Sequence, residues 1–250
     1  MKDSRAKGIY YGWFIVAASF AITVIGGGIN SSLGVFALPM SDEFGWSRTL
    51  ISSAVATGIL ASGISQVLSG HLHDILGGRK LIIAGIFLVG LSTILLSGTF
   101  HYLYFLILFG IIRSTLMSSI SMTTLAVLIA KWFKKSRSTA ISISSSGGSV
   151  GGLLLVPFST YLILVADWRV TWVALGVIML VLVLPTAYIV LRNEPSDMGL
   201  QPDGDNIGGN EDGPEVVYVE KGPLVVSCLL YTSDAADEGL GVDLGGRRII

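Results

Sequence analysis

Six long apolar stretches constrain this chain more than any other feature of its sequence. They cover residues 11–38, 50–72, 81–97, 102–130, 138–165 and 169–191. A helix needs about 20 mainly apolar residues to cross roughly 30 Å of hydrocarbon, and these stretches are too long for the strands of a membrane barrel. Because only helices and closed barrels satisfy their backbone hydrogen bonds in lipid, the pattern predicts an all-α membrane protein with six spans.

Composition agrees with a chain that lipid solvates. Apolar residues make up 52% of the sequence and charged residues 13%, whereas about a quarter of the residues in soluble domains are charged. There is no basic stripe that could bind a phosphate backbone, so we expect no nucleic acid partner. The basic start leads into an apolar stretch longer than a signal peptide would have, without a small-residue cleavage site, so the first helix is expected to stay in the membrane.

Basic residues indicate the orientation. If the N-terminus is cytoplasmic, ten basic residues lie inside and two, Arg48 and Arg169, lie outside. The inner set is Lys2, Arg5, Lys7, Arg79, Lys80, Lys131, Lys134, Lys135, Arg137 and Arg192. This positive-inside bias predicts a bacterial-type inner-membrane protein with residues 1–10 in the cytoplasm and a bundle over 11–191.

The residues after the last stretch change in character. Residues 192–227 are rich in polar residues and glycine, and they are expected to begin a central cytoplasmic linker. Residues 228–250 resemble an in-frame translation of a sequencing adapter followed by its flow-cell primer, so we exclude them from fold reasoning as an artefact. The one cysteine, Cys228, lies there. We therefore expect the reading frame to be cut, and no disulfide or cysteine–metal chemistry in the rest.

Polar residues divide the spans into two kinds. Before its last residue, Ser97, the third has two hydroxyl residues, Ser92 and Thr93, and the sixth from Trp172 onward has only Thr186. The first, second, fourth and fifth are richer in polar side chains. Polar side chains within a membrane face other helices or water. Spans three and six are therefore expected to face lipid, which is the plan of a 3+3 repeat.

Glycines on the fifth stretch are spaced for close helix packing. Gly147 and Gly151, like Gly148 and Gly152, are four residues apart, so a neighbouring backbone can approach. A nucleotide-binding loop is disfavoured for this glycine-rich string because no strand precedes it.

Arg113 is the most informative side chain. It lies about 11 residues into the fourth stretch, roughly 16 Å deep, where a charge costs at least about 2.5 kcal/mol. Its guanidinium could bind the carboxylate of an anionic substrate, or it could pair structurally with carbonyls or an acid in a part of the protein outside this sequence. The candidate substrate-binding residues are Arg113, Asn30, Ser114, Ser118 and Ser121.

No aspartate or glutamate lies in the apolar interior of any stretch, and His71 and His73 are near the inner mouth. If a proton is transported together with the solute, the titratable group that carries it must lie elsewhere in the protein. Otherwise the carrier exchanges anions without protons. The sequence shows no metal-ligand cluster, nucleophile triad, intramembrane carboxylate pair or P-loop. We therefore expect neither an enzyme nor a cofactor.

The segment 70–80, GHLHDILGGRK, resembles the G-x-x-x-D-R/K-x-G-R-R/K signature of the major facilitator superfamily. Four positions match, namely Gly70, Asp74, Gly77 and Arg79, while Ile75 and Gly78 replace basic residues. The resemblance implies that the four matching residues gate the inner face. It also implies twelve helices in two pseudo-symmetric halves, of which this chain holds the first.

Other segments look like the monocarboxylate-porter and oxalate/formate-antiporter branch. They are YGW at 11–13, FGWSR at 44–48, KWF at 131–133, DWR at 167–169 and RNEPSDMGL at 192–200. The resemblance implies secondary active transport of small organic anions, monocarboxylates or dicarboxylates, by alternating access, with symport and antiport both open. The alternative is a neutral or cationic solute, with Arg113 structural.

Overall fold

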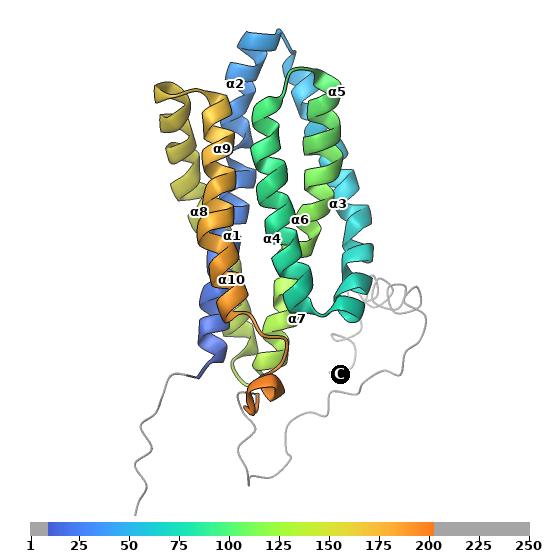
Figure 1. Ribbon diagram of the computed structural model, residues 1–250, viewed down its shortest axis with the longest axis vertical. Coiled ribbons are helices and arrows are strands. Elements are labelled where there is room, and N and C mark those ends of the chain that lie inside the picture. Colours follow the sequence, from blue (N-terminus) through green and yellow to red (C-terminus); the bar gives the residue numbers. More distant parts are fainter. Residues whose placement is uncertain (1–9, 203–250) are drawn as a thin grey trace, which may run out of the picture. The chain divides into compact units, whose positions relative to one another are not determined.

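The computed structural model describes residues 10–202. Within this range six helices are long and apolar enough to cross a membrane: Gly12–Phe44, Arg48–Leu76, Gly78–Gly98, Tyr102–Trp132, Arg137–Val165 and Trp168–Val190. The expected six-span, all-helical fold is confirmed (Figure 1). The adapter-like segment 228–250 and most of the expected linker lie outside the described residues.

The spans are built from several helical segments. The first comprises α1 (Gly12–Ser31) and α2 (Leu33–Phe44), the second is α3 (Arg48–Leu76), and the third is α4 (Gly78–Leu95) with the short turn η1 (Leu96–Gly98). The fourth contains α5 (Tyr102–Phe105), η2 (Leu106–Arg113), α6 (Ser114–Met117), η3 (Ser118–Ile120) and α7 (Met122–Trp132). The fifth is α8 (Arg137–Val165), the sixth comprises α9 (Trp168–Ile178), η4 (Met179–Val183) and α10 (Leu184–Val190), and η5 (Pro195–Met198) follows.

The first span is longer than its apolar stretch. It was expected to end at residue 38, before Pro39, but the helix continues through Pro39 to Phe44. It ends at Gly45, whose φ of 66° is the left-handed conformation that glycine adopts without strain. The second span then begins at a conventional cap, where the Ser47 hydroxyl accepts the Leu50 N–H at 3.2 Å.

Helices α1 and α8 pack with their backbones in contact. A Cβ added to Gly151 would overlap the carbonyl oxygen of Val24, and one added to Gly27 would lie 2.9 Å from the Cα of Gly148. A Cβ on Gly148 itself would meet open space. Gly151 therefore lies directly against α1, as does Gly147, whose added Cβ would lie 2.8 Å from the Phe20 carbonyl oxygen, while Gly152 would make only ordinary contact.

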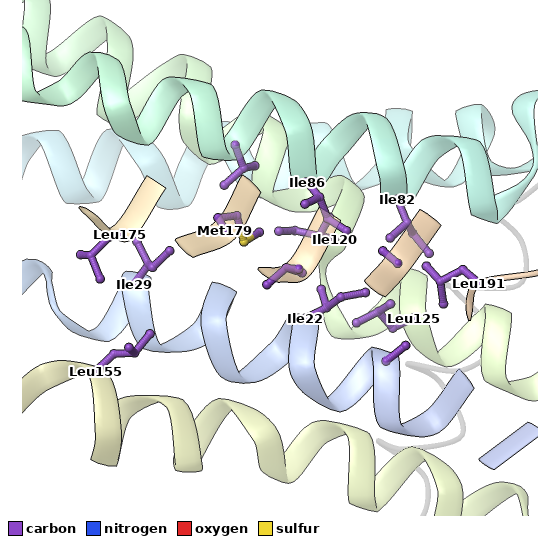
Figure 2. Close-up of a cluster of buried hydrophobic side chains, with 14 of the residues drawn as sticks. Ile22, Ile29, Ile82, Ile86, Ile120, Leu125, Leu155, Leu175, Met179 and Leu191 are labelled. Atoms are coloured by element: carbon purple, nitrogen blue, oxygen red, sulfur yellow. The ribbon is translucent and has the colours of Figure 1, made fainter. Parts of the chain in front are cut away.

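The opposite side of α1 is buried in a cluster of apolar side chains (Figure 2). Ile22 and Ile29 of α1 pack in this cluster, which also takes residues from α4, the fourth span, the sixth span and, through Leu155, α8. The other labelled members are Ile82, Ile86, Ile120, Leu125, Leu155, Leu175, Met179 and Leu191. The first span thus contacts the α8 backbone through its glycines and packs its apolar side chains in this cluster.

The exposed faces of the helices differ in polarity. On α4 the exposed face carries Phe87, Leu88, Leu91 and Leu95, which suits contact with lipid. On α8 hydroxyl side chains are exposed in the first half, namely Ser142, Ser145, Ser146 and Ser149, and large apolar side chains such as Leu153 and Leu164 are exposed in the second half. The apolar face of α4 agrees with the outer position expected for the third span, whereas the exposed face of α8 is mixed.

Candidate functional site

The fourth span is broken in its middle. The sequence predicted one continuous helix over 102–130, and this prediction was wrong in detail, because Ser121 is extended (φ −64°, ψ 159°) between η3 and α7. Its hydroxyl caps α7 by accepting the Thr124 N–H at 3.5 Å. Serine side chains compete with helical backbone bonds and favour caps, which explains why the break falls in a serine-rich segment.

Side chains from the second span stabilise the break. Gln66 Nε2 donates to the hydroxyl oxygens of Ser121 and Thr123, both at 3.0 Å. The Thr124 hydroxyl donates to the carbonyl of Ser118 at 3.1 Å. Irregular backbone at membrane depth is tolerated only where protein buries it or where it lines a cavity.

A cavity of about 200 Å³ lies against the break. Its polar lining consists of hydroxyls from three spans: Thr23 of α1, Ser121 of the fourth span and Ser145 of α8. The remaining lining residues are apolar or glycine, namely Ile22, Gly26, Gly27, Met117, Ile120, Met122 and Gly148. A concave site with a few convergent polar groups is the usual form of a small-molecule site.

Arg113 is buried beside α4. Its side chain is 1% exposed, and its Nε donates to the Thr93 hydroxyl oxygen at 3.3 Å. The guanidinium carbon lies 5.3 Å from the centroid of the Phe109 ring. Within the described residues its Nη2 has no hydrogen-bond partner, and Arg113 does not line the 200 Å³ cavity.

The other sequence candidates lie in different places. Ser114 faces α3, where its hydroxyl occupies the space that a Cβ on Gly58 would need, and it donates to the Phe109 carbonyl at 2.9 Å. Ser118 is buried and donates to Thr115. Asn30 is exposed on α1, on the helix face that also carries Thr23.

The structure therefore brings only Ser121, of the five candidates, to the cavity, and the roles of all five stay predictions. Sequence reasoning missed Thr23, Ser145 and Gln66 as members of this region. One signal was available for Gln66, because it is the only amide side chain in residues 48–76.

The motif residues, at the end of α3 and the start of α4, lie against the residues that follow the sixth span. Gly77 ends α3 with a φ of 80°, and the Arg79 N–H donates to Asn193 Oδ1 at 2.8 Å. Asp74 lines a cavity of about 430 Å³ that also includes the ion pair between Lys131 and Glu194, whose charged atoms are 3.1 Å apart. A Cβ on Gly70 would meet open space. The gating role of these motif residues stays a prediction.

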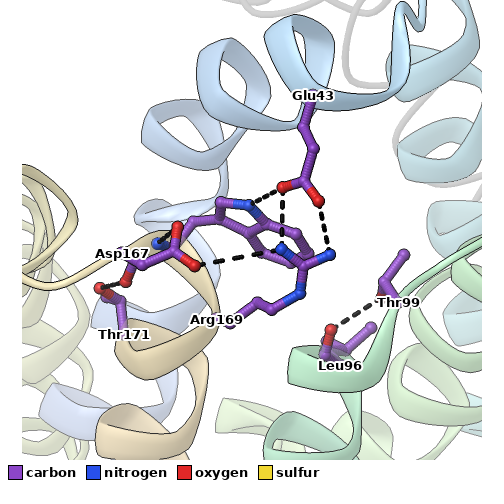
Figure 3. Close-up of polar contacts among 7 residues, drawn as sticks. Glu43, Leu96, Thr99, Asp167, Arg169 and Thr171 are labelled. Carbon is purple, nitrogen blue, oxygen red and sulfur yellow. Dashed lines mark hydrogen bonds and ion pairs between the residues drawn. The ribbon is translucent and has the colours of Figure 1, made fainter.

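An ion pair joins the end of the first span to the start of the sixth (Figure 3). Arg169 Nη1 and Nη2 donate to the two carboxylate oxygens of Glu43 at 2.8 and 2.6 Å, and Trp168 Nε1 donates to the same carboxylate at 2.7 Å. Asp167 caps α9 in a strained conformation, with a φ of 141°. The C-terminal end of α2 is thereby held against α9.

Comparison with known proteins decides the family. The family model described as Major Facilitator Superfamily matches residues 13–232. The chain belongs to this superfamily. The family resemblance predicted from segment 70–80 is confirmed, and superfamily members are generally carriers rather than enzymes.

Relatives of this superfamily chain include named transporters. It is 27% identical to the "Uncharacterized MFS-type transporter YcxA" of Bacillus subtilis, over 73% of this chain and 45% of that protein. It is 27% identical to "Probable anion transporter 3, chloroplastic" of Arabidopsis thaliana, over 58% and 29% of the two chains. It is 26% identical to "Monocarboxylate transporter 14" of Homo sapiens, over 68% and 33%. The chain thus spans less than half the length of these relatives.

Proposed function

We propose that the full-length protein is a secondary active transporter that moves small organic anions, monocarboxylates or dicarboxylates, by alternating access. The observation that carries the proposal is a buried arginine in the middle of a span, with one nitrogen unpartnered among the described residues. Acidic residues of the described range lie at the ends of the spans or in connecting segments, namely Asp42, Glu43, Asp74, Asp167, Glu194 and Asp197. The membrane interior of this half is therefore positively charged.

The arrangement suits an anion in the 200 Å³ cavity. Arg113 precedes Ser121 by eight residues, which is about 12 Å of helical rise. At an effective dielectric constant of about 20, a unit negative charge at that distance gains roughly 1.4 kcal/mol, which is about tenfold in affinity. The hydroxyls of Thr23, Ser121 and Ser145 line the cavity. Those of Thr23 and Ser145 donate to the carbonyls of Ser144 and Ser142 in this structure, and each would rotate to donate to a carboxylate oxygen instead. We infer that Arg113 contributes through its field and that Ser121 contacts the substrate.

The names of the relatives support the same substrate class. A probable anion transporter and a monocarboxylate transporter are both among them. Their identity to this chain is low, so the support is for the class of anionic solutes rather than for one compound.

A neutral or cationic substrate is the second candidate, because Arg113 also has structural contacts. It donates to Thr93 and lies over the Phe109 ring, and both contacts stabilise a guanidinium without any substrate. In this alternative Arg113 holds the third and fourth spans together.

Transport requires more protein than this chain provides. Alternating access moves two bundles around a midplane site, and the relatives are more than twice as long as the matched part of this chain. We propose a second six-helix half that completes the site, and a proton or a counter-anion as the coupled species. We also propose the inner membrane of a bacterial-type cell with a cytoplasmic N-terminus, supported by the basic residues at the inner ends of the spans.

Uptake by the full-length protein tests the proposal. The gene would be rebuilt with its downstream sequence, and the purified protein reconstituted into proteoliposomes. Uptake of labelled monocarboxylates, dicarboxylates, a neutral sugar and an organic cation would be measured side by side, with protein-free vesicles as the control. We expect saturable uptake of an anion only. Saturable uptake of the sugar or the cation, with none of the anions, would refute the proposal in favour of the second candidate.

A further inference from the structure

A groove of about 570 Å³ lies between the third and sixth spans, near the start of α4. Helices α4 and α10 lie side by side there (Figure 1). The wall from α4 consists of Lys80, Ile83, Ala84 and Phe87, which form one stripe at helical spacing. The wall from α10 consists of Leu184 and Tyr188. The groove therefore lies on the face of the bundle that is expected to meet lipid. It shares no lining residue with the 200 Å³ cavity.

The groove has a cationic end and an apolar end. Arg79 and Lys80 lie at the first turn of α4, where we expect the helix to leave the membrane, and Phe87 lies about 10 Å further along the axis. Arg79 is fixed in place, because its Nη2 donates to the Tyr188 carbonyl at 2.9 Å and its guanidinium carbon lies 5.5 Å from the centre of the Tyr188 ring. Lys80 is exposed.

This polarity matches an amphiphile with a negatively charged head at the membrane surface. The lining holds two cationic side chains and no carboxylate, so nothing in it would pair with the ammonium group of a zwitterionic headgroup. Basic pockets between spans attract the headgroups of anionic lipids. A length of 10 Å is about two thirds of one leaflet's share of a 30 Å hydrocarbon core, which suits the upper part of an acyl chain.

We propose that this groove is a binding site for an anionic phospholipid. The phosphate lies against Arg79 and Lys80, and one acyl chain lies along Ala84 and Phe87, against Leu184. The site is distinct from the proposed substrate path and does not depend on which solute the protein carries. The proposal also gives Arg79 a role in lipid binding, in addition to the gating role that the motif resemblance implies.

Native mass spectrometry of the delipidated full-length protein tests the site. The probes are phosphatidylglycerol and phosphatidylcholine with identical acyl chains, and glycerol phosphate as a soluble headgroup. Lys80→Gln removes one charge, and Lys135→Gln is its control, because Lys135 is also an exposed basic residue near an inner helix end. Ala84→Phe fills the apolar part of the groove, and Leu91→Phe, on the exposed face of the same helix but outside the lining, is its control.

We expect phosphatidylglycerol to bind at least fivefold more tightly than phosphatidylcholine. Lys80→Gln should weaken phosphatidylglycerol binding about fivefold, the factor that corresponds to roughly 1 kcal/mol per basic side chain near a membrane surface, and Lys80→Arg should restore it. Ala84→Phe should weaken binding similarly, while both controls stay within twofold of the original chain. Circular dichroism checks that each variant remains helical.

Three results would overturn the proposal. Equal binding of the two phospholipids would mean that the groove is a general lipid-facing surface. Equal loss in Lys80→Gln and Lys135→Gln would mean that the attraction is diffuse. Competition by glycerol phosphate at the concentration of the lipid would mean that only a free phosphate group is recognised.

Discussion

Replacing Arg113 by glutamine in the full-length protein tests how a buried cation acts on the substrate. The side chain is held against α4 by Thr93 and does not line the cavity that contains Ser121. The eight residues from Arg113 to Ser121 correspond to about 12 Å of helical rise, and a charge acting over that separation contributes roughly 1.4 kcal/mol. This predicts that Arg113→Gln raises the half-saturating concentration of an anionic substrate about tenfold.

The size of the effect distinguishes three roles for Arg113. A direct bidentate contact between guanidinium and carboxylate would cost about 2–5 kcal/mol on removal, which is thirtyfold or more. A purely structural role would leave the half-saturating concentration of the anion unchanged. Only the action at a distance predicts an intermediate loss of about tenfold.

The assay is the concentration dependence of labelled anion uptake into proteoliposomes, with the amount of folded protein in the vesicles measured for each variant. Thr93→Val is the matched control, because it removes the hydrogen bond to Nε and keeps the positive charge. We expect this control to change the half-saturating concentration less than threefold. Wild-type-like anion uptake by Arg113→Gln would refute the reasoning and assign Arg113 to structure alone.

Three further predictions concern packing, the outer ion pair and the break. Gly151→Ala should lower the free energy of unfolding in detergent by about 1–3 kcal/mol, because its Cβ would overlap the backbone of α1. The control Gly148→Ala should change the free energy of unfolding by less than about 0.5 kcal/mol, because its Cβ would meet open space. Equal losses in the two variants would disprove the close contact. A double-mutant cycle of Glu43→Gln and Arg169→Gln should give a coupling free energy of about 0.2–1 kcal/mol, because the side chains are 39% and 37% exposed and water weakens their attraction. A coupling free energy above about 2 kcal/mol would contradict the expectation that water weakens this ion pair. Ser121→Ala should cost about 1 kcal/mol through the lost cap of α7, and hydrogen exchange of the α7 amides should rise; unchanged exchange would show that the cap is dispensable.

The number of spans could be predicted because it depends on the length of apolar runs alone. The ends of the spans could not be predicted as well. Pro39 lacks an N–H and usually ends a helix, but α2 continues past it. At the start of α4, Arg79 and Lys80 are helical although they are charged, because long basic side chains can bury their stems while their heads reach the membrane surface. Hydropathy excludes such residues from a span, but helix geometry does not.

The break in the fourth span shows why the site was harder to predict than the fold. Positions along an unbroken α-helix can be assigned to faces at 100° per residue. Between Leu106 and Ser121, however, the span passes through a π-helical segment, a short α-helix and a 3₁₀ turn. Each of these changes the number of residues per turn and so shifts the phase. The direction of Arg113 relative to Ser121 therefore depended on tertiary packing, and sequence spacing could not determine it.

The third span shows what a count of polar residues can and cannot indicate. Its few hydroxyls predicted an outer, lipid-facing helix, and its exposed face is indeed apolar at Phe87 and Leu91. Yet one of those hydroxyls, on Thr93, is fully buried and accepts the hydrogen bond from Arg113. This single hydroxyl accepts from Nε, one of the five N–H donors of a guanidinium, and Nη2 has no partner within the described residues. The polarity of a span thus indicates which helices face lipid. The partner of a buried charge depends instead on one residue, and the number of hydroxyls does not reveal that Thr93 lies on the buried face of its helix.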